Sequence, residues 1–138
     1  MNRYTYEEIQ VGQSEKFTAG ITEEMLDSFR GITGDTNPLH NDEKYAQDRK
    51  YKGRVAYGML TASFMSTLAG VYLPGEHSLI QSAEVKFAAP VYAGDVLDIK
   101  GEVTEKNDTY RLIYVKVTMK NSAGEKVCRG KMQIGVIE

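Results

Sequence analysis

The stretch from Val55 to Leu73 contains no charged side chain. Its length would nearly suffice to cross a bilayer. However, it includes two glycines and several hydroxyl side chains, and no cluster of basic residues flanks it. We therefore expect a buried helix here and no membrane span. A helix without a charged face needs cover on nearly all sides, so the rest of the chain must wrap around it.

The C-terminal half has the pattern of that cover, because from about Gln81 onwards it reads as strands and turns. Runs rich in β-branched residues occupy Val96–Val103 and Leu112–Met119, and a last run spans Lys126–Ile137. The turn-prone segments 106–108 and 121–124 separate them. Connections this short join antiparallel neighbours, so the sequence predicts a mostly antiparallel sheet.

Upstream, Thr22 followed by two glutamates is typical of a helix start. Apolar residues recur at helical spacing until Gly34 ends the run. A further short helix is expected after Asn41 or Asp42. Together these elements predict an α+β fold in which a curved antiparallel sheet wraps round one long central helix, the shape called a hot dog, although other α+β arrangements would also fit.

Composition limits the domain organisation and the partners. With 138 residues and no linker or repeat, the chain is expected to form a single domain over residues 1–138. A net charge of −2 gives no general reason to bind nucleic acid or an anionic membrane. The lone Cys128 excludes a disulfide within the chain and any multi-cysteine metal site. The polar and acidic first residues do not resemble a signal peptide, so we expect a cytoplasmic protein.

The segment Thr33–Asp42 carries the most informative side chains. Pro38 forces Asn37 toward an extended conformation, which predicts an ordered loop and not a helix. Such a loop would hold the Asp35 carboxyl and the His40 imidazole five residues apart on a stiff connector. Two titratable groups of different pKa that converge on one water suit acid–base catalysis. The same residue types also suit a turn cap and an ordinary structural histidine.

A second constellation opens the apolar helix. Neither Ala56 nor Tyr57 can cap a helix with a side-chain oxygen, so the first backbone N–H groups would be free for a ligand. At Gly58 a carbonyl could approach the backbone closely, as in an oxyanion hole. Close packing alone would also explain this glycine. Further along the same face, Ser66 could orient a carboxylate or could simply pack.

These motifs match a known family. The run Thr33–His40 closely resembles the signature of the MaoC-like hydratases, also called hydratase 2 or (R)-specific enoyl-CoA hydratases. The similarity continues through 56–60, 73–75 and 87–95 and so extends over most of the chain. The resemblance implies a hot-dog fold and a homodimer or higher homo-oligomer whose sheets join edge to edge, with active sites at the subunit interface.

The resemblance also assigns roles to single residues. It implies that Asp35 and His40 are the catalytic pair and that Gly58 supplies the oxyanion N–H. It further implies support of the aspartate by Ser66, and Asn37 belongs to the same signature as a supporting residue. The family commonly has histidine just before the glycine, where this chain has Tyr57. We expect this difference to alter the shape of the pocket and the choice of substrate, with the reaction unchanged.

The expected activity is reversible syn hydration of a trans-2-enoyl-CoA to the (R)-3-hydroxyacyl-CoA. No metal and no separate cofactor are expected, because coenzyme A is part of the substrate and the two histidines have no metal-ligand spacing. The alternatives are a hot-dog acyl-CoA thioesterase and a non-catalytic acyl-CoA-binding protein of the same fold. The acyl-CoA thioester is the expected partner, and nucleic acid and membrane are not.

Overall fold

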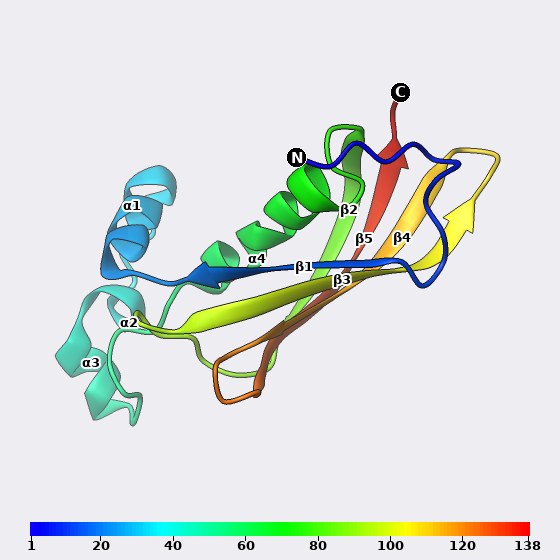
Figure 1. Ribbon diagram of the computed structural model, residues 1–138. Helices are drawn as coiled ribbons and strands as arrows, with labels where there is room; N and C mark the ends of the chain where they lie inside the picture. Colours follow the sequence, from blue (N-terminus) through cyan, green and yellow to red (C-terminus); the bar gives the residue numbers. More distant parts are fainter.

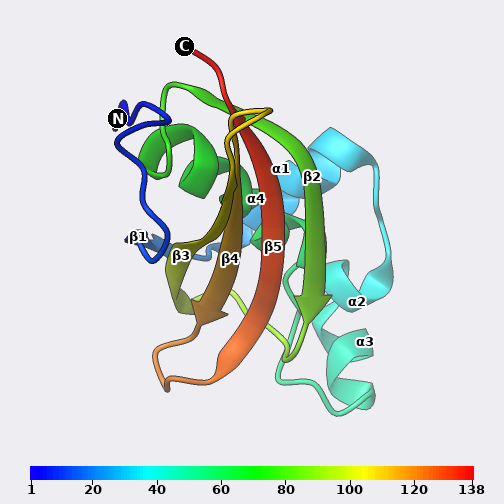
Figure 2. The same ribbon diagram turned by 90° about the vertical axis from the view of Figure 1, so that its right-hand side faces the viewer.

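The computed structural model describes residues 1–138, and its centre is one helix held in the curve of a five-stranded antiparallel sheet (Figure 1). The strand order across the sheet is β1-β3-β4-β5-β2. The strands are β1 (Ser14–Gly20), β2 (Ser78–Phe87), β3 (Val96–Asn107), β4 (Leu112–Lys120) and β5 (Lys126–Val136). Turned by 90°, the strands bend together around the central helix α4 (Figure 2). The hot-dog prediction is therefore confirmed.

The central helix α4 (Gly58–Thr67) continues directly into a π-helical segment, η1 (Leu68–Tyr72). It packs on the inner face of the sheet where two glycines leave room for it. A methyl group added at Gly101 of β3 would lie 2.8 Å from the Leu68 side chain. One at Gly130 of β5 would lie 3.1 Å from the Met65 side chain and 2.4 Å from a backbone oxygen. The helix thus approaches the sheet more closely than any larger residue at these positions would allow.

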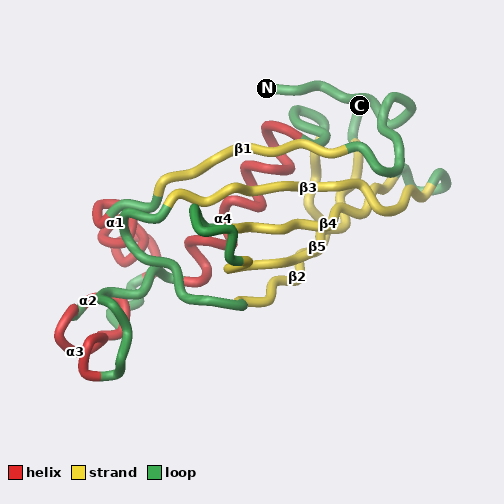
Figure 3. Tube along the Cα trace, turned by 60° about the horizontal axis from the view of Figure 1, so that its bottom comes forward, coloured by secondary structure: helices red, strands yellow, loops and turns green.

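Three short helices lie together beyond one end of the sheet (Figure 3). They are α1 (Glu23–Thr33), α2 (Pro38–Asn41) and α3 (Glu43–Asp48). Thr22 caps α1 through a hydrogen bond from the Met25 N–H, and Gly34 ends the helix with a positive φ of 75°. Asp42 caps α3 in the same way. The predicted start of α1 and the predicted short helix after Asp42 are both confirmed.

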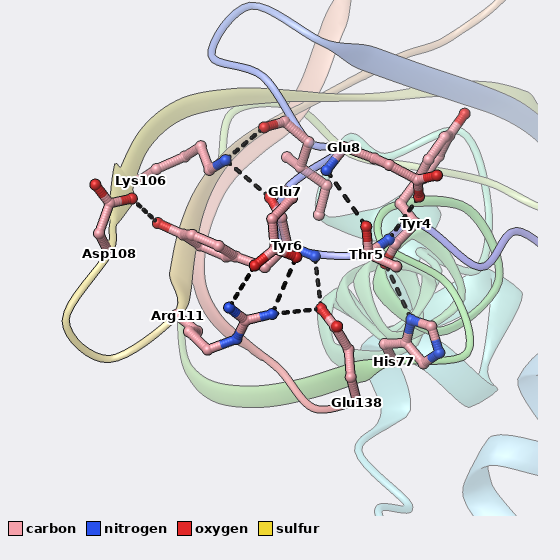
Figure 4. A network of polar contacts seen from close by, with 11 residues as sticks. Tyr4, Thr5, Tyr6, Glu7, Glu8, His77, Lys106, Asp108, Arg111 and Glu138 are labelled. Carbon is pink, nitrogen blue, oxygen red and sulfur yellow. Dashed lines mark hydrogen bonds and ion pairs between the residues drawn. The ribbon is translucent and has the colours of Figure 1, made fainter.

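The N-terminal segment is fastened beside the C-terminus by a polar network (Figure 4). The buried Tyr6 donates a 2.6 Å hydrogen bond to Asp108. Arg111 forms ion pairs with Glu7 and Glu138, at 2.6 and 2.8 Å. The contacts of Tyr6 with Asp108 and of Glu7 with Arg111 each join residues more than a hundred positions apart. The network closes the end of the core that lies away from α1 to α3.

Two expectations need correction, and one strand was not predicted. The segment after Asn37 is not a loop, because Pro38–Asn41 forms one helical turn. Proline at the first helical position loses no hydrogen bond, and the Asn37 side chain caps the turn. Strand β1 was not predicted, since Phe17 is its only large apolar residue. The central helix also keeps an open side in this chain, where Met59, Ser63 and Ser66 are exposed.

Candidate active site

A cavity of about 880 Å³ lies between α4 and the edge strand β2. Apolar side chains make up most of its wall, and a few polar groups gather at the end near α2. The lining includes Phe29, Asp35, His40, Tyr57, Gly58 and Ser66, and the strand side is formed by Ile80, Ala83, Val85 and Phe87. The structure therefore brings the predicted carboxyl, imidazole and helix-opening glycine to one cavity.

Asp35 is held by local hydrogen bonds of the turn between α1 and α2. Its backbone N–H donates to the Thr33 hydroxyl at 3.1 Å, and its carboxylate accepts the Asn37 N–H at 3.0 Å. Asn37 itself caps α2 and does not line the cavity. Its contribution in this structure is to fix the turn and, through its backbone N–H, one oxygen of Asp35.

The His40 ring is oriented by a hydrogen bond to the backbone. Its Nδ1 lies 2.7 Å from the carbonyl oxygen of Val55. A carbonyl can only accept, so Nδ1 must carry the proton, and in the neutral ring Nε2 is left as an acceptor. This geometry prepares Nε2 to take a proton from a water molecule.

Tyr57 connects the two candidate groups. Its hydroxyl donates a 2.5 Å hydrogen bond to the carbonyl oxygen of Asp35 and accepts one from the Asn41 amide at 3.0 Å. Its ring stacks on the His40 imidazole with 4.3 Å between ring centroids. Only 2% of the residue is exposed, so its ring is fixed by packing. A single buried side chain thus touches both the turn that carries Asp35 and the imidazole.

Gly58 is the first residue of α4, and no side chain caps this helix. The Thr61 N–H bonds to the Tyr57 carbonyl, but the N–H groups of Gly58, Met59 and Leu60 have no acceptor in the protein. Free N–H groups at the positive end of a helix attract a carbonyl oxygen that gains negative charge. A methyl group at Gly58 would lie 3.0 Å from the Phe87 ring, so the glycine also leaves space at the cavity wall.

Ser66 lines the same cavity on α4 but forms no hydrogen bond to Asp35 in this structure. The exposed position of its hydroxyl leaves it available to substrate, water or a neighbouring group. The predicted support of the aspartate is therefore not seen as a direct contact, and Ser66 stays a candidate because it faces the cavity.

Sequence reasoning missed the role of Arg54 as a brace for this region. Its Nε donates to the His40 carbonyl at 2.7 Å, and its guanidinium also bonds to Asp27 on α1 at 2.8 Å. The hydrogen bond from Arg54 is the main cause that lowers the pKa of Asp27. Arg54 thereby ties α1 to the turn that carries His40. No spacing in the sequence signals this contact, because it joins segments that meet only in the fold.

Cys128 has no place in this site. The residue is fully buried in β5, and burial raises the pKa of its thiol, which is the opposite of what a nucleophile needs.

No group of three or more His, Cys, Asp or Glu side chains has the arrangement of a metal site. None of the helices is both long enough and apolar enough to pass through a membrane.

Comparison with known proteins places this site in a family. The model of the MaoC like domain matches residues 7–125. An (R)-specific enoyl-CoA hydratase from Rhodospirillum rubrum is 35% identical over 131 residues, which cover 95% of this chain and 90% of the relative. The chain therefore belongs to the MaoC-like family.

Solved structures agree with that assignment. The R-hydratase PhaJ1 from Pseudomonas aeruginosa, in its unliganded form, has a TM-score of 0.90 and 34% identity; the match covers 97% of this chain and 86% of that one. An (R)-hydratase from A. caviae has a TM-score of 0.88 and 26% identity, with 93% and 97% covered. The relative from Rhodospirillum rubrum and both of these structures are named as hydratases.

Proposed function

We propose that this protein is an (R)-specific enoyl-CoA hydratase, which reversibly adds water to a trans-2-enoyl-CoA to give the (R)-3-hydroxyacyl-CoA. The observation that carries the proposal is the convergence of Asp35, His40 and the unpaired N–H of Gly58 on one largely apolar cavity. The apolar walls suit an acyl chain, and the polar groups at one end suit its thioester. Relatives named as hydratases support the same reaction.

In this scheme Asp35 and His40 hold one water molecule against the β-carbon. The water oxygen bonds to that carbon while its proton passes to the pair, with Nε2 of His40 as the acceptor that the bond to Val55 leaves free. A proton from the same pair adds to the α-carbon on the same face. Protons taken and given balance, and the step is redox-neutral, so it requires no redox cofactor.

The backbone N–H of Gly58 stabilises the negative charge that develops on the substrate during the reaction. As water adds, negative charge grows on the thioester oxygen, and a backbone donor already aimed at that oxygen needs no reorganisation. Once its open side is covered, the apolar cavity strengthens this interaction because it keeps bulk water away. Such a donor distinguishes the transition state from the substrate, which is the requirement for catalysis.

The free edge of the sheet supports assembly into a homodimer. The edge strand β2 is paired only with β5, and most of its residues are exposed, including the apolar Leu79, Ile80 and Phe87. Unpaired edges of this length bind another strand readily. Pairing of two β2 edges would extend the sheet and cover the open side of the cavity. Light scattering should give about twice the chain mass of 15.4 kDa.

Incubation with crotonyl-CoA tests the reaction directly. A hydratase removes the conjugated double bond and its ultraviolet absorbance, and chiral chromatography of the product should give the (R)-alcohol. Release of free thiol with the double bond intact would instead identify a thioesterase. Binding without consumption would identify a non-catalytic acyl-CoA-binding protein. Either result would overturn the proposed reaction.

A further inference from the structure

A row of basic side chains crosses the outer face of the sheet. Residues that lie directly opposite one another on neighbouring antiparallel strands share a face, so the strand registers define the row. The registers pair Lys16 with Lys100, Lys100 with Thr118, Thr118 with Arg129, and Arg129 with Lys86. These five residues, one from each strand, form the basic row.

The basic row points away from α4. Its four cations are exposed, whereas Ile99 and Gly101, the neighbours of Lys100 in β3, are buried on the side of the helix. The strands bend around α4 in Figure 2, so the face opposite the helix is convex. None of the four cations forms an ion pair within the chain. Their charge therefore remains available to a partner.

The charge of this face is opposite in sign to that of the whole chain. The rows on either side of the basic row are Ser14, Glu102, Lys116, Lys131 and Glu84, and Thr18, Asp98, Lys120 and Lys126. The three rows together contain eight of the 17 lysines and arginines and three of the 19 acidic residues of a chain whose net charge is −2. A local positive potential attracts an anionic partner whatever the sign of the total charge.

Pairs of like charges oppose one another across these rows. Two pairs belong to the basic row, Lys16 with Lys100 and Arg129 with Lys86. Two more lie beside it, Lys116 with Lys131 and Lys120 with Lys126. Like charges directly opposite in a sheet are destabilising. Sheet stability alone would favour opposite charges at such positions, so the arrangement indicates a surface adapted to an anionic partner.

We propose that the outer face of the sheet docks an acidic protein, whose carboxylates lie along the basic row. Four steps between neighbouring strands make the row about 19 Å long. A patch of this size suits a transient contact that electrostatic attraction steers. The inference does not rest on the proposed function, because no residue of the three rows lines the cavity beside α4. A separate groove of about 680 Å³ gives carboxylate side chains a place among Lys16, Lys100, Lys120 and Lys126.

The acidic residues beside the basic row favour a protein over a uniform polyanion. Glu102 and Asp98 each lie two residues along β3 from Lys100, a distance of about 7 Å. A nucleic-acid backbone or an anionic bilayer would bring negative charge against them, whereas a folded protein can place a neutral or basic residue there. No aromatic side chain lies in the three rows for bases to stack on. A flat bilayer would also touch only the crest of a convex face.

Fluorescence anisotropy tests the docking with a labelled peptide of ten Glu-Ser repeats. The neutral serines can face Glu102 and Asp98 while the glutamates follow the basic row. We expect binding at low ionic strength that weakens as salt is added, because exposed charges are screened. A peptide of ten Gln-Ser repeats should not bind. Failure of the acidic peptide to bind would overturn the inference, and so would tighter binding of a ten-nucleotide oligo(dT) or of vesicles that contain phosphatidylserine.

A double variant tests the position of the charges. Lys100→Gln/Arg129→Gln should bind the acidic peptide roughly tenfold more weakly, the size expected for the loss of two exposed ion pairs. Lys44→Gln/Lys50→Gln removes two exposed charges elsewhere and is the matched control, with binding unchanged. Equal losses in both variants would show attraction to the overall charge only and would contradict a docking surface.

Two further measurements separate docking from other roles of the basic row. The Lys100→Gln/Arg129→Gln protein should melt no lower than wild type, because each substitution relieves a pair of like charges. A lower melting temperature would mean that the row stabilises the sheet, against the inference. Its KM for crotonyl-CoA should be unchanged, and a raised KM would show that the row binds the phosphates of coenzyme A instead. If the wild-type protein does not hydrate crotonyl-CoA, the proposed function fails, and peptide binding still decides the docking.

Discussion

The hydroxyl of Tyr57 is hydrogen-bonded to the backbone carbonyl of Asp35, and the ring of the same tyrosine stacks on His40. A single side chain therefore sets the position of the turn and the tilt of the imidazole at once. The phenol of Tyr57 thus joins the Asp35 turn to the imidazole of His40.

Removal of that hydroxyl tests the link. Tyr57→Phe keeps the stacked ring but frees the Asp35 turn, so we expect kcat to fall by about tenfold, which corresponds to about 1.4 kcal/mol of lost positioning. The melting temperature should change little, because Asp35 is exposed and water can replace the lost donor. Tyr110→Phe, at a 73% exposed tyrosine, is the control. Equal kcat values for Tyr57→Phe and wild type would show that the link does not position the pair.

The catalytic pair itself is tested by conservative changes. Asp35→Asn and His40→Gln should each lower the hydration rate roughly 10²–10⁴-fold, because each removes one positioned acid–base group. Circular dichroism should show an intact fold, since neither side chain belongs to the core. Asp48→Asn, on the exposed end of α3, should retain full activity. Wild-type turnover in either variant would remove that residue from the mechanism.

Close packing of α4 on the sheet predicts a stability effect. Gly101→Ala and Gly130→Ala each push a methyl group into the helix or a backbone oxygen, and overpacking of this kind costs about 1–3 kcal/mol. Gly20→Ala is the matched control in a strand, because an added methyl group there meets nothing within 4 Å. Urea denaturation should place both variants well below the control. Unaltered midpoints would mean that the helix can shift away from the sheet without loss.

The N-terminal network predicts a loss of stability at high pH. Burial is the main cause that raises the pKa of Tyr6 to about 12, and the hydrogen bond to Asp108 adds to it. In the unfolded chain the tyrosine titrates near its ordinary value of 10.0, so its contribution is complete below that pH and is lost as the pH rises toward 12. Melting temperatures measured between pH 9 and 12 should fall more steeply for wild type than for Tyr6→Phe. Parallel curves would contradict this assignment.

Much of the fold could be predicted because its signals are local. The charge-free run marks the central helix, Thr22 and Gly34 mark the ends of α1, and alternating β-branched residues mark the later strands. Strand β1 escaped prediction because its neighbour β3 lies some eighty residues away, and only pairing with that strand stabilises its mixed sequence. The sequence predicts a loop at Pro38 because proline disfavours helical backbone at the residue before it. That restriction applies to Asn37 only, so a helix can still begin at Pro38 itself.

The convergence of Asp35, His40 and Gly58 on one cavity could be predicted from the sequence, and the contacts that hold these residues in place could not. Asp35, His40 and Gly58 belong to motifs whose spacing is fixed within one short segment. The contacts of Tyr57 and Arg54, by contrast, join α1, α2 and the start of α4, and no pattern along the chain encodes which of these segments will meet.

In the large cavity, the wall opposite α4 is built mainly from β2, a strand with a single neighbour in this chain. Substitutions at Ile80, Ala83 or Val85 can change the room available to an acyl chain while the central strands keep their packing. Evolution can therefore retune which chain lengths enter without rebuilding the folding core. If two copies pair along that strand, each such substitution also alters the interface between the subunits. Changes in substrate range and changes in the dimer interface would then evolve together.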